Sequence, residues 1–162
     1  MESKVRLSNF SAILTISIIL LLVFGCVFTF HEKQTFWILA GVTLLLLITG
    51  LLYSPVAIKV DSDNITVKSV LKKHPVPISE VESVERFQPF QAPVRYGAMR
   101  VFASGGFMGY WGVFFAHDIG RFTAYYGKSS DCFLVRMKDG SQYVLGCENP
   151  DELIKKIIEY KK

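Results

Sequence analysis

Two long apolar runs open the chain. Positions 10–30 hold 21 consecutive residues without a charge, and positions 35–53 hold 19 more. At 1.5 Å per residue, each run is long enough as a helix to cross the hydrocarbon core of a bilayer, which is about 30 Å thick. Only His31–Gln34 separate the runs. The pattern therefore predicts a hairpin of two membrane spans within residues 1–54.

The positive charges near these runs predict an orientation for the hairpin. Lys4 and Arg6 precede the first run, while the tip of the hairpin holds Lys33 alone. Four lysines follow the second run: Lys59, Lys68, Lys72 and Lys73. Because Lys and Arg accumulate on the cytoplasmic side of membrane proteins, we expect both termini in the cytoplasm.

After Pro55 the pattern changes to an alternation of apolar and polar residues, which is typical of half-buried strands. The alternation is clearest at 65–68, 121–126 and 133–138. Shorter runs continue it at 57–60, 74–78, 84–87, 99–103, 110–117 and 142–146. Asp139–Gly140 is a strong signal for a tight hairpin, because such turns need positive φ. The strands follow one another without helices between them, which predicts an antiparallel barrel or sandwich of about seven strands.

The end of the chain predicts one amphipathic helix. Asn149 suits the N-cap, Pro150 the first helical position, and Asp151 the positive end of the helix dipole. Four apolar residues then fall on one stripe: Leu153, Ile154, Ile157 and Ile158. The helix needs an apolar surface to cover, so we expect it to cap the strands. The predicted fold of residues 55–162 is α+β, mainly β, behind the two-helix hairpin.

Composition narrows the possible functions. The chain is 51% hydrophobic and 20% charged, and the apolar excess lies in the two runs, so the remaining residues suffice for one small domain. That domain has 15 basic and 12 acidic residues, a balance that does not favour nucleic acid as a partner. Cys132 and Cys147 follow no disulfide or metal pattern, and either reduced thiols or a disulfide is compatible with their spacing.

No group of residues predicts catalysis, a metal or a cofactor. His117 and Asp118 are adjacent, but neighbours in an extended chain point to opposite faces of a strand. Ser129–Asp131 reads as a turn without a nucleophile elbow. His74 and His117 have no ligand spacing relative to the cysteines. We therefore expect no enzyme, with an unrecognised hydrolase using His117 as a remote alternative.

The most unusual stretch is Gly105–Gly112, in which four glycines alternate with large apolar residues. Glycines beside bulky residues in a β protein mark bends, and the bulky residues then either fill the core or form a contact patch. A phosphate loop is disfavoured because no helix follows. The candidate contact surface consists of Arg100, Gly105, Gly106, Phe107, Gly109, Tyr110, Trp111, Gly112 and Arg121.

Three stretches resemble the membrane-anchored bacterial pleckstrin-homology-like (PH-like) domains. Val76–Val84 is similar to that family's strand, acidic turn and return strand; Arg100–Gly112 to its glycine-rich centre; and Tyr143–Ile158 to its last strand and helix. The resemblance implies a binding or assembly module at a bacterial inner membrane. It does not imply phosphoinositide binding here, because the first hairpin, where relatives carry basic residues, reads Asp61–Asn64.

Three functions follow. The preferred one is a membrane-tethered interaction or assembly module, with a protein partner or a second copy of the chain. The alternative is a sensor of lipid head groups or small ligands. The basic residues Lys72, Lys73 and His74 are a candidate lipid contact, unless they form a solvated turn. The hydrolase is the third.

Overall fold

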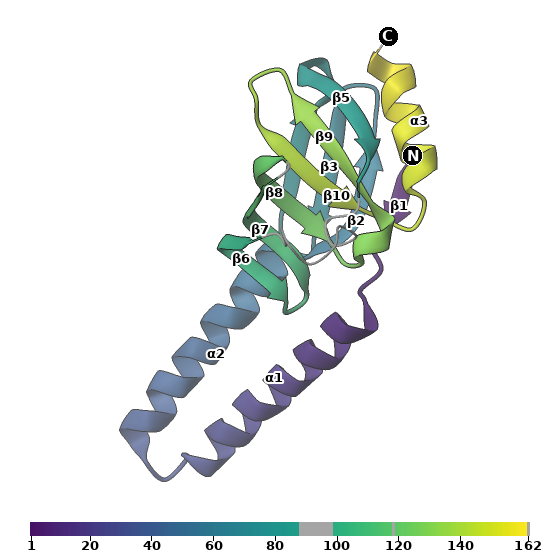
Figure 1. Ribbon diagram of the computed structural model, residues 1–162. Coiled ribbons are helices and arrows are strands. Elements are labelled where there is room, and N and C mark those ends of the chain that lie inside the picture. Colours follow the sequence, from purple (N-terminus) through teal and green to yellow (C-terminus); the bar gives the residue numbers. More distant parts are fainter. Residues whose placement is uncertain (88–98, 118, 162) are drawn as a thin grey trace.

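Two long apolar helices project from one end of a β-rich domain (Figure 1). The computed structural model describes residues 1–87, 99–117 and 119–161. The helices are α1 (Asn9–Phe28) and α2 (Lys33–Tyr53), and both are long and apolar enough to cross a membrane. Among the residues that the structure describes, Ser11 and Gly50 are the only buried ones in these helices, which distinguishes both from the mostly buried core helices of a soluble protein.

The domain contains two β-sheets. The four-stranded sheet has the order β1 (Glu2–Lys4), β2 (Pro55–Val60), β3 (Asn64–Ser69), β4 (Lys73–Pro77). The six-stranded sheet has the order β5 (Val81–Arg86), β9 (Cys132–Met137), β10 (Gln142–Gly146), β8 (Gly120–Tyr126), β7 (Gly109–Ala116), β6 (Met99–Gly106). Two short 3-10 turns connect strands in the described part of the chain: η1 (Ile78–Glu80) and η3 (Ser129–Asp131). A C-terminal helix, α3 (Pro150–Lys161), completes the domain.

The main core lies where the two sheets and α3 meet. Ile58 and Val67 from the four-stranded sheet pack with Phe133 and Leu145 from the six-stranded sheet, all essentially inaccessible to solvent. Leu153, like Ile157 one turn later, brings the apolar stripe of α3 into the same cluster. The predicted capping helix is confirmed. Its stripe covers an apolar surface that would otherwise face water, which is the main stabilisation available to so short a helix.

The opposite face of the six-stranded sheet carries a second buried cluster. Alternate positions on neighbouring strands contribute to it, including Phe114 on β7, Phe122 on β8 and Leu134 on β9. The Phe114 and Phe122 rings stack with their centroids 5.7 Å apart. The six-stranded sheet is thus apolar on both faces, whereas the prediction from alternation expected one apolar face per strand.

The predicted mainly-β domain with a terminal helix is confirmed, with two corrections to its geometry. The sheets do not close into a barrel, so the sandwich is the correct alternative. The strands are also not all antiparallel, because β10 pairs with β8 in parallel, with Val144 opposite Ala124. A hairpin turn cannot make a parallel pair, so β9 comes between β8 and β10 in the sequence.

The N-terminal residues belong to the domain sheet, although the sequence offered no strand pattern there. β1 pairs with β2, placing Ser3 opposite Ile58. The chain then runs over β8, where the Ser8 N–H donates to Gly127 O at 3.0 Å. Ser8 also caps α1 by accepting from the Ser11 N–H. At the other helix, one residue, Ser54, separates the end of α2 from β2. Both helices therefore leave the domain through short, hydrogen-bonded connections.

Candidate functional site at the helix and domain junction

The glycine-rich segment forms the β6–β7 hairpin and its tight turn. The turn residues Gly106 and Gly109 have φ of 129° and 97°, values that L side chains rarely adopt. Met108 between them has φ of 52° and is the single non-glycine residue with positive φ among the described residues. The Ser104 hydroxyl donates to Phe107 O at 2.8 Å and ties the turn to the strand. The glycines are therefore required by the turn itself.

The tip of this hairpin docks onto both apolar helices. The Met108 N–H donates to Thr15 Oγ1 of α1 at 2.8 Å. The Ser54 hydroxyl, directly after α2, donates to Met108 O at 2.6 Å. Gly50 of α2 lies beneath the tip, where a Cβ would come within 2.5 Å of Met108 Sδ. Gly106 lies close to α1 in the same way, because a Cβ there would come within 2.8 Å of Leu14 Cδ2. One residue, Met108, thus bridges α1 and the end of α2 through its N–H and its C=O.

An aromatic column continues from the tip to both sheets. Trp111 of β7 stacks on Tyr53, the last residue of α2, with ring centroids 5.7 Å apart. Tyr53 stacks on His74 of β4 at 5.8 Å, and His74 stacks on Tyr125 of β8 at 5.2 Å. Lys72 places its Nζ 5.7 Å from the centroid of the Tyr53 ring. The column joins α2 to both sheets, so these three parts of the chain pack as one unit.

Burial within the column changes its titrating groups. Burial lowers the pKa of His74, against an opposing contribution from its hydrogen bond to the backbone of Leu52. Burial also raises the pKa of Tyr125 to about 12. His74 Nε2 is buried without a hydrogen-bond partner among the described residues. Burial is the larger effect, so it favours the uncharged forms of His74 and Tyr125.

The turn between β3 and β4 lies beside the same end of α2. The Leu71 N–H donates to Leu51 O at 3.1 Å, which fixes the turn against the last turn of the helix. Val70 and Leu71 are 57% and 61% exposed despite being apolar. Lys72 and Lys73, two of the candidate lipid contacts, follow directly and are exposed. A cavity of about 400 Å³ behind the turn is lined by Lys72, Lys73, His74, Pro75, Val76, Thr123, Tyr125 and Tyr143.

The candidate contact residues are therefore divided between two places. Those from Gly105 to Gly112 lie in one hairpin, where Gly112 permits β6 to approach: a Cβ there would lie 2.5 Å from Phe102 O. Arg100 on β6 lies over Gly105, which leaves room for its guanidinium. Arg121 is elsewhere, on β8, in register with Phe115 of β7. That the segment contacts a partner stays a prediction.

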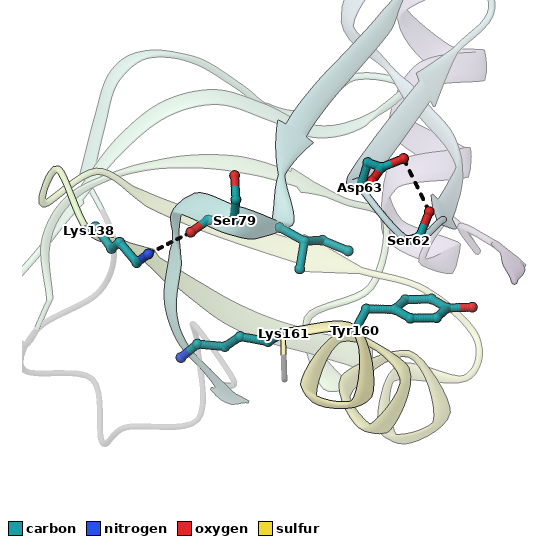
Figure 2. A pocket seen from close by; sticks show the side chains of 7 residues that line it. Ser62, Asp63, Ser79, Lys138, Tyr160 and Lys161 are labelled. Atoms are coloured by element: carbon teal, nitrogen blue, oxygen red, sulfur yellow. Dashed lines mark hydrogen bonds between the residues drawn. The ribbon is translucent and has the colours of Figure 1, made fainter.

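The first hairpin, Asp61–Asn64, lies at the opposite end of the domain from the helices. It follows β2, whose six residues lead away from α2 over about 20 Å. A cavity lies at this end, lined by residues of the first hairpin and of the end of α3 (Figure 2), and its volume is about 360 Å³. Its lysines are already engaged: Lys138 Nζ donates to Ser79 O at 2.7 Å, and Lys161 donates to Glu82 O. This end of the domain therefore has an acidic turn, and the ammonium groups of both lysines are hydrogen-bonded to backbone carbonyl oxygens.

The residues considered for redox or catalytic chemistry lie apart from the junction. Cys132 and Cys147 are free buried thiols, which resolves the open choice between thiols and a disulfide. Burial raises the pKa of both thiols, so neither is activated as a nucleophile. His117 lies directly after β7 and is exposed. Asp118, its predicted opposite-facing neighbour, lies outside the described residues.

Sequence reasoning missed the residues that make the junction. Thr15, Tyr53, Ser54 and Met108 were not among the candidates, because their partners are remote in the sequence. Thr15 and Met108 are 93 positions apart. One available signal was the hydroxyl of Thr15 within an apolar run, since polar side chains in such helices often bond to neighbouring elements.

Two sheets sharing a core with a C-terminal helix, and a surface built of turns and strand edges, define the class of PH-like domains. Residues 56–160 match the family model of the bacterial PH domain, and the chain belongs to that family. No curated protein and no solved structure matches the chain. Domains of this class are generally non-catalytic interaction modules. Membership of the family therefore supports the prediction of an interaction module.

Proposed function

We propose that the protein is a membrane-tethered interaction module of the bacterial inner membrane. In this proposal α1 and α2 span the bilayer as a hairpin, and both termini and the PH-like domain lie in the cytoplasm. The exposure of both helices supports the spans, because about 20 apolar residues exposed to water would be strongly unfavourable. Lys4 and Arg6 at one helix entrance, and the lysines that follow α2, support the orientation.

The observation that carries the proposal is the docking of the β6–β7 tip on both helices. The two hydrogen bonds of Met108, to Thr15 and from Ser54, join the domain to its anchor at a second place besides the chain connections. An anchor on a flexible linker would leave the domain free to rotate. Here the domain has one orientation at the bilayer surface, which is useful for a module that presents a binding surface to a membrane-bound partner.

This orientation also places the β3–β4 turn at the bilayer surface. Val70 and Leu71 are exposed apolar side chains beside the end of α2. Lys72 and Lys73 follow at the level where anionic head groups lie, each adding about 1 kcal/mol of attraction near such a surface. The lysines thus serve as a supporting lipid contact. A fluorophore attached at Leu71→Cys should show a blue-shifted emission in vesicles, and the same label at Ser62→Cys should not.

The partner contact that we propose is a row across three strands. Met99 of β6 lies opposite Phe115 of β7, which lies opposite Arg121 of β8. All three side chains are exposed, with Met99 at 64% and Phe115 at 38%. Two apolar side chains beside an arginine match the composition of interface hot spots. The row retains Arg121 from the candidate surface and adds two residues that the sequence did not single out.

Site-specific photocross-linking in native membranes tests this function. A photoreactive residue at Phe115 should capture one defined species, either a heterologous protein or a second copy of the chain. The matched control is the same residue at Lys155, which is exposed on α3. Arg121→Glu should reduce capture from position 115 without changing protein level. Equal capture from both positions, or capture that survives Arg121→Glu, would contradict the proposed row.

A further inference from the structure

A mostly apolar groove runs along the outer edge of β6, between this strand and the two helices. Its volume is about 560 Å³. Five consecutive residues of β6, 100–104, line it, and because successive residues of a strand face opposite sides, the groove must follow the strand edge. Ile18 of α1 and Leu46 of α2 form the opposite wall. The tip residue Phe107 and the column residue Trp111 close one side.

The groove is mostly apolar; its clearly polar lining residues are Thr49 of α2, whose hydroxyl bonds back to Leu45 O, and Arg100 and Ser104 of β6. Ile18 lies nine positions into α1, about 13 Å from its domain end, and Leu46 lies seven positions before Tyr53, about 10 Å from that end of α2. Tyr53 and Trp111, residue types that favour the membrane interface, lie near the domain. Among the described residues, Arg100 is the single charged residue of the lining, and it forms no ion pair with any of them.

We propose that this groove binds a phospholipid of the surrounding bilayer, with an acyl chain between Ile18, Leu46 and Phe102 and an anionic phosphate at Arg100. The proposal rests on the proposed membrane tethering of α1 and α2. The distribution of polarity carries it, because a long apolar channel with one unpaired guanidinium near the interface complements a lipid with a charged head group. Phe102, 85% exposed to solvent in the free chain, gains an apolar neighbour from the acyl chain.

The size of the groove favours a lipid over a transmembrane helix of a partner. A helix about 10 Å across occupies about 420 Å³ per turn, so the groove holds little more than one turn. A helix crossing the bilayer needs contact over several turns. A volume of about 560 Å³ is instead within the usual range of small-molecule sites, about 300 to 1,000 Å³.

Photolabelling with lipid probes tests the site in the full-length protein. The protein is reconstituted in phosphatidylcholine vesicles that contain a photoactivatable acyl-chain probe, either a phosphatidylglycerol or a phosphatidylcholine. We expect adducts concentrated in residues 99–111 and around Leu46, with at least threefold more labelling from the anionic probe. Leu46→Trp fills the groove and should reduce this labelling at least threefold. Leu45→Trp, one position away on the exposed face of α2, should leave it unchanged.

The charge of Arg100 at the mouth of the groove is tested separately from the volume of the groove. Arg100→Gln should remove the preference for the anionic probe while the acyl-chain adducts remain. This readout stands even if Leu46→Trp disturbs the fold. Adducts spread evenly over the exposed faces of both helices, or a preference unchanged by Arg100→Gln, would overturn the lipid site.

Two controls separate the alternatives. A protein cross-link from position 102 in native membranes, in place of lipid labelling, would assign the groove to a partner segment and overturn the proposal. Release of the chain from vesicles by alkaline carbonate would instead show that the tethering has failed. Retention of the chain together with uniform labelling would show that the lipid site alone is wrong.

Discussion

Replacing Thr15 by Val should weaken the docking of the β6–β7 tip on α1. Thr15 Oγ1 accepts the Met108 N–H at 2.8 Å and donates to Ser11 O at 2.7 Å within α1. Valine keeps the branched shape of threonine and removes both hydrogen bonds. The bond within the helix is dispensable, because Ser11 O already accepts in the helix ladder. The Met108 N–H has no second acceptor among the described residues, so it loses its partner.

The expected magnitude follows from that orphaned donor. A partly buried N–H left without a partner costs about 1–3 kcal/mol. This cost falls on the docked state alone, since water satisfies the N–H once the tip has left the helices. The undocked fraction should therefore rise by about 5-fold to 150-fold. Met108 already has the unfavourable φ of 52°, so the turn has little additional stability to offset the loss.

Hydrogen exchange measures this change directly. In the full-length protein in nanodiscs, amides of residues 105–111 should lose protection by the same factor, while amides of the main core should not. Thr43→Val is the matched control, because Thr43 bonds back to Leu39 O at 2.8 Å in α2 and has no hydrogen bond to the β6–β7 hairpin among the described residues. Thr15→Ser keeps the hydroxyl and should restore protection. Equal protection in Thr15→Val and Thr43→Val would refute the docking interaction.

Three further results are expected from the domain. Burial lowers the pKa of His74 in the folded domain below its ordinary value of 6.5. Between the folded pKa and 6.5 the unfolded chain therefore binds more protons than the folded domain, so the melting temperature should fall as the pH falls below about 6.5. His74→Phe should flatten this dependence, and an unchanged slope would contradict the assignment. Leu153→Ala should lower the free energy of unfolding of the domain by about 2–5 kcal/mol in denaturant titrations, whereas a loss below 1 kcal/mol would argue against the burial of this α3 side chain in the main core. Cys132 and Cys147 should resist maleimide in the native protein and react after denaturation; rapid native labelling would show that the second cluster opens at Cys132 or the main core at Cys147.

The sequence predicted the elements of this fold more successfully than their contacts. Strands such as β3 and β9 were predictable because alternation is a local property, and the turn at Gly140, with φ of 82°, has a local chemical cause. The Pro150 start of α3 was predictable for the same reason. β1 was not, because three residues are too few to show a period and its partner lies more than 50 positions away.

At the candidate site, too, the local element was predictable from the sequence and its distant contacts were not. The glycines of the hairpin indicated a bend, and the structure contains one. The sequence could not indicate that the bend reaches the helices, because that contact depends on Thr15 of α1 and Ser54 meeting one residue, Met108. Nor could it indicate the parallel pairing of β8 with β10, which results from the path of the chain between distant strands.

The central claim is that a membrane hairpin holds this domain on the cytoplasmic side. Its most direct test compares single cysteines at Lys33, in the tip of the hairpin, and at Ser62, at the far end of the domain, in a Cys26→Ala background. In intact spheroplasts, a membrane-impermeant maleimide should label position 33 and not position 62; inverted vesicles should give the reverse, with the chain retained after alkaline carbonate. Labelling of both positions from the same side, or release of the chain by carbonate, would contradict the account.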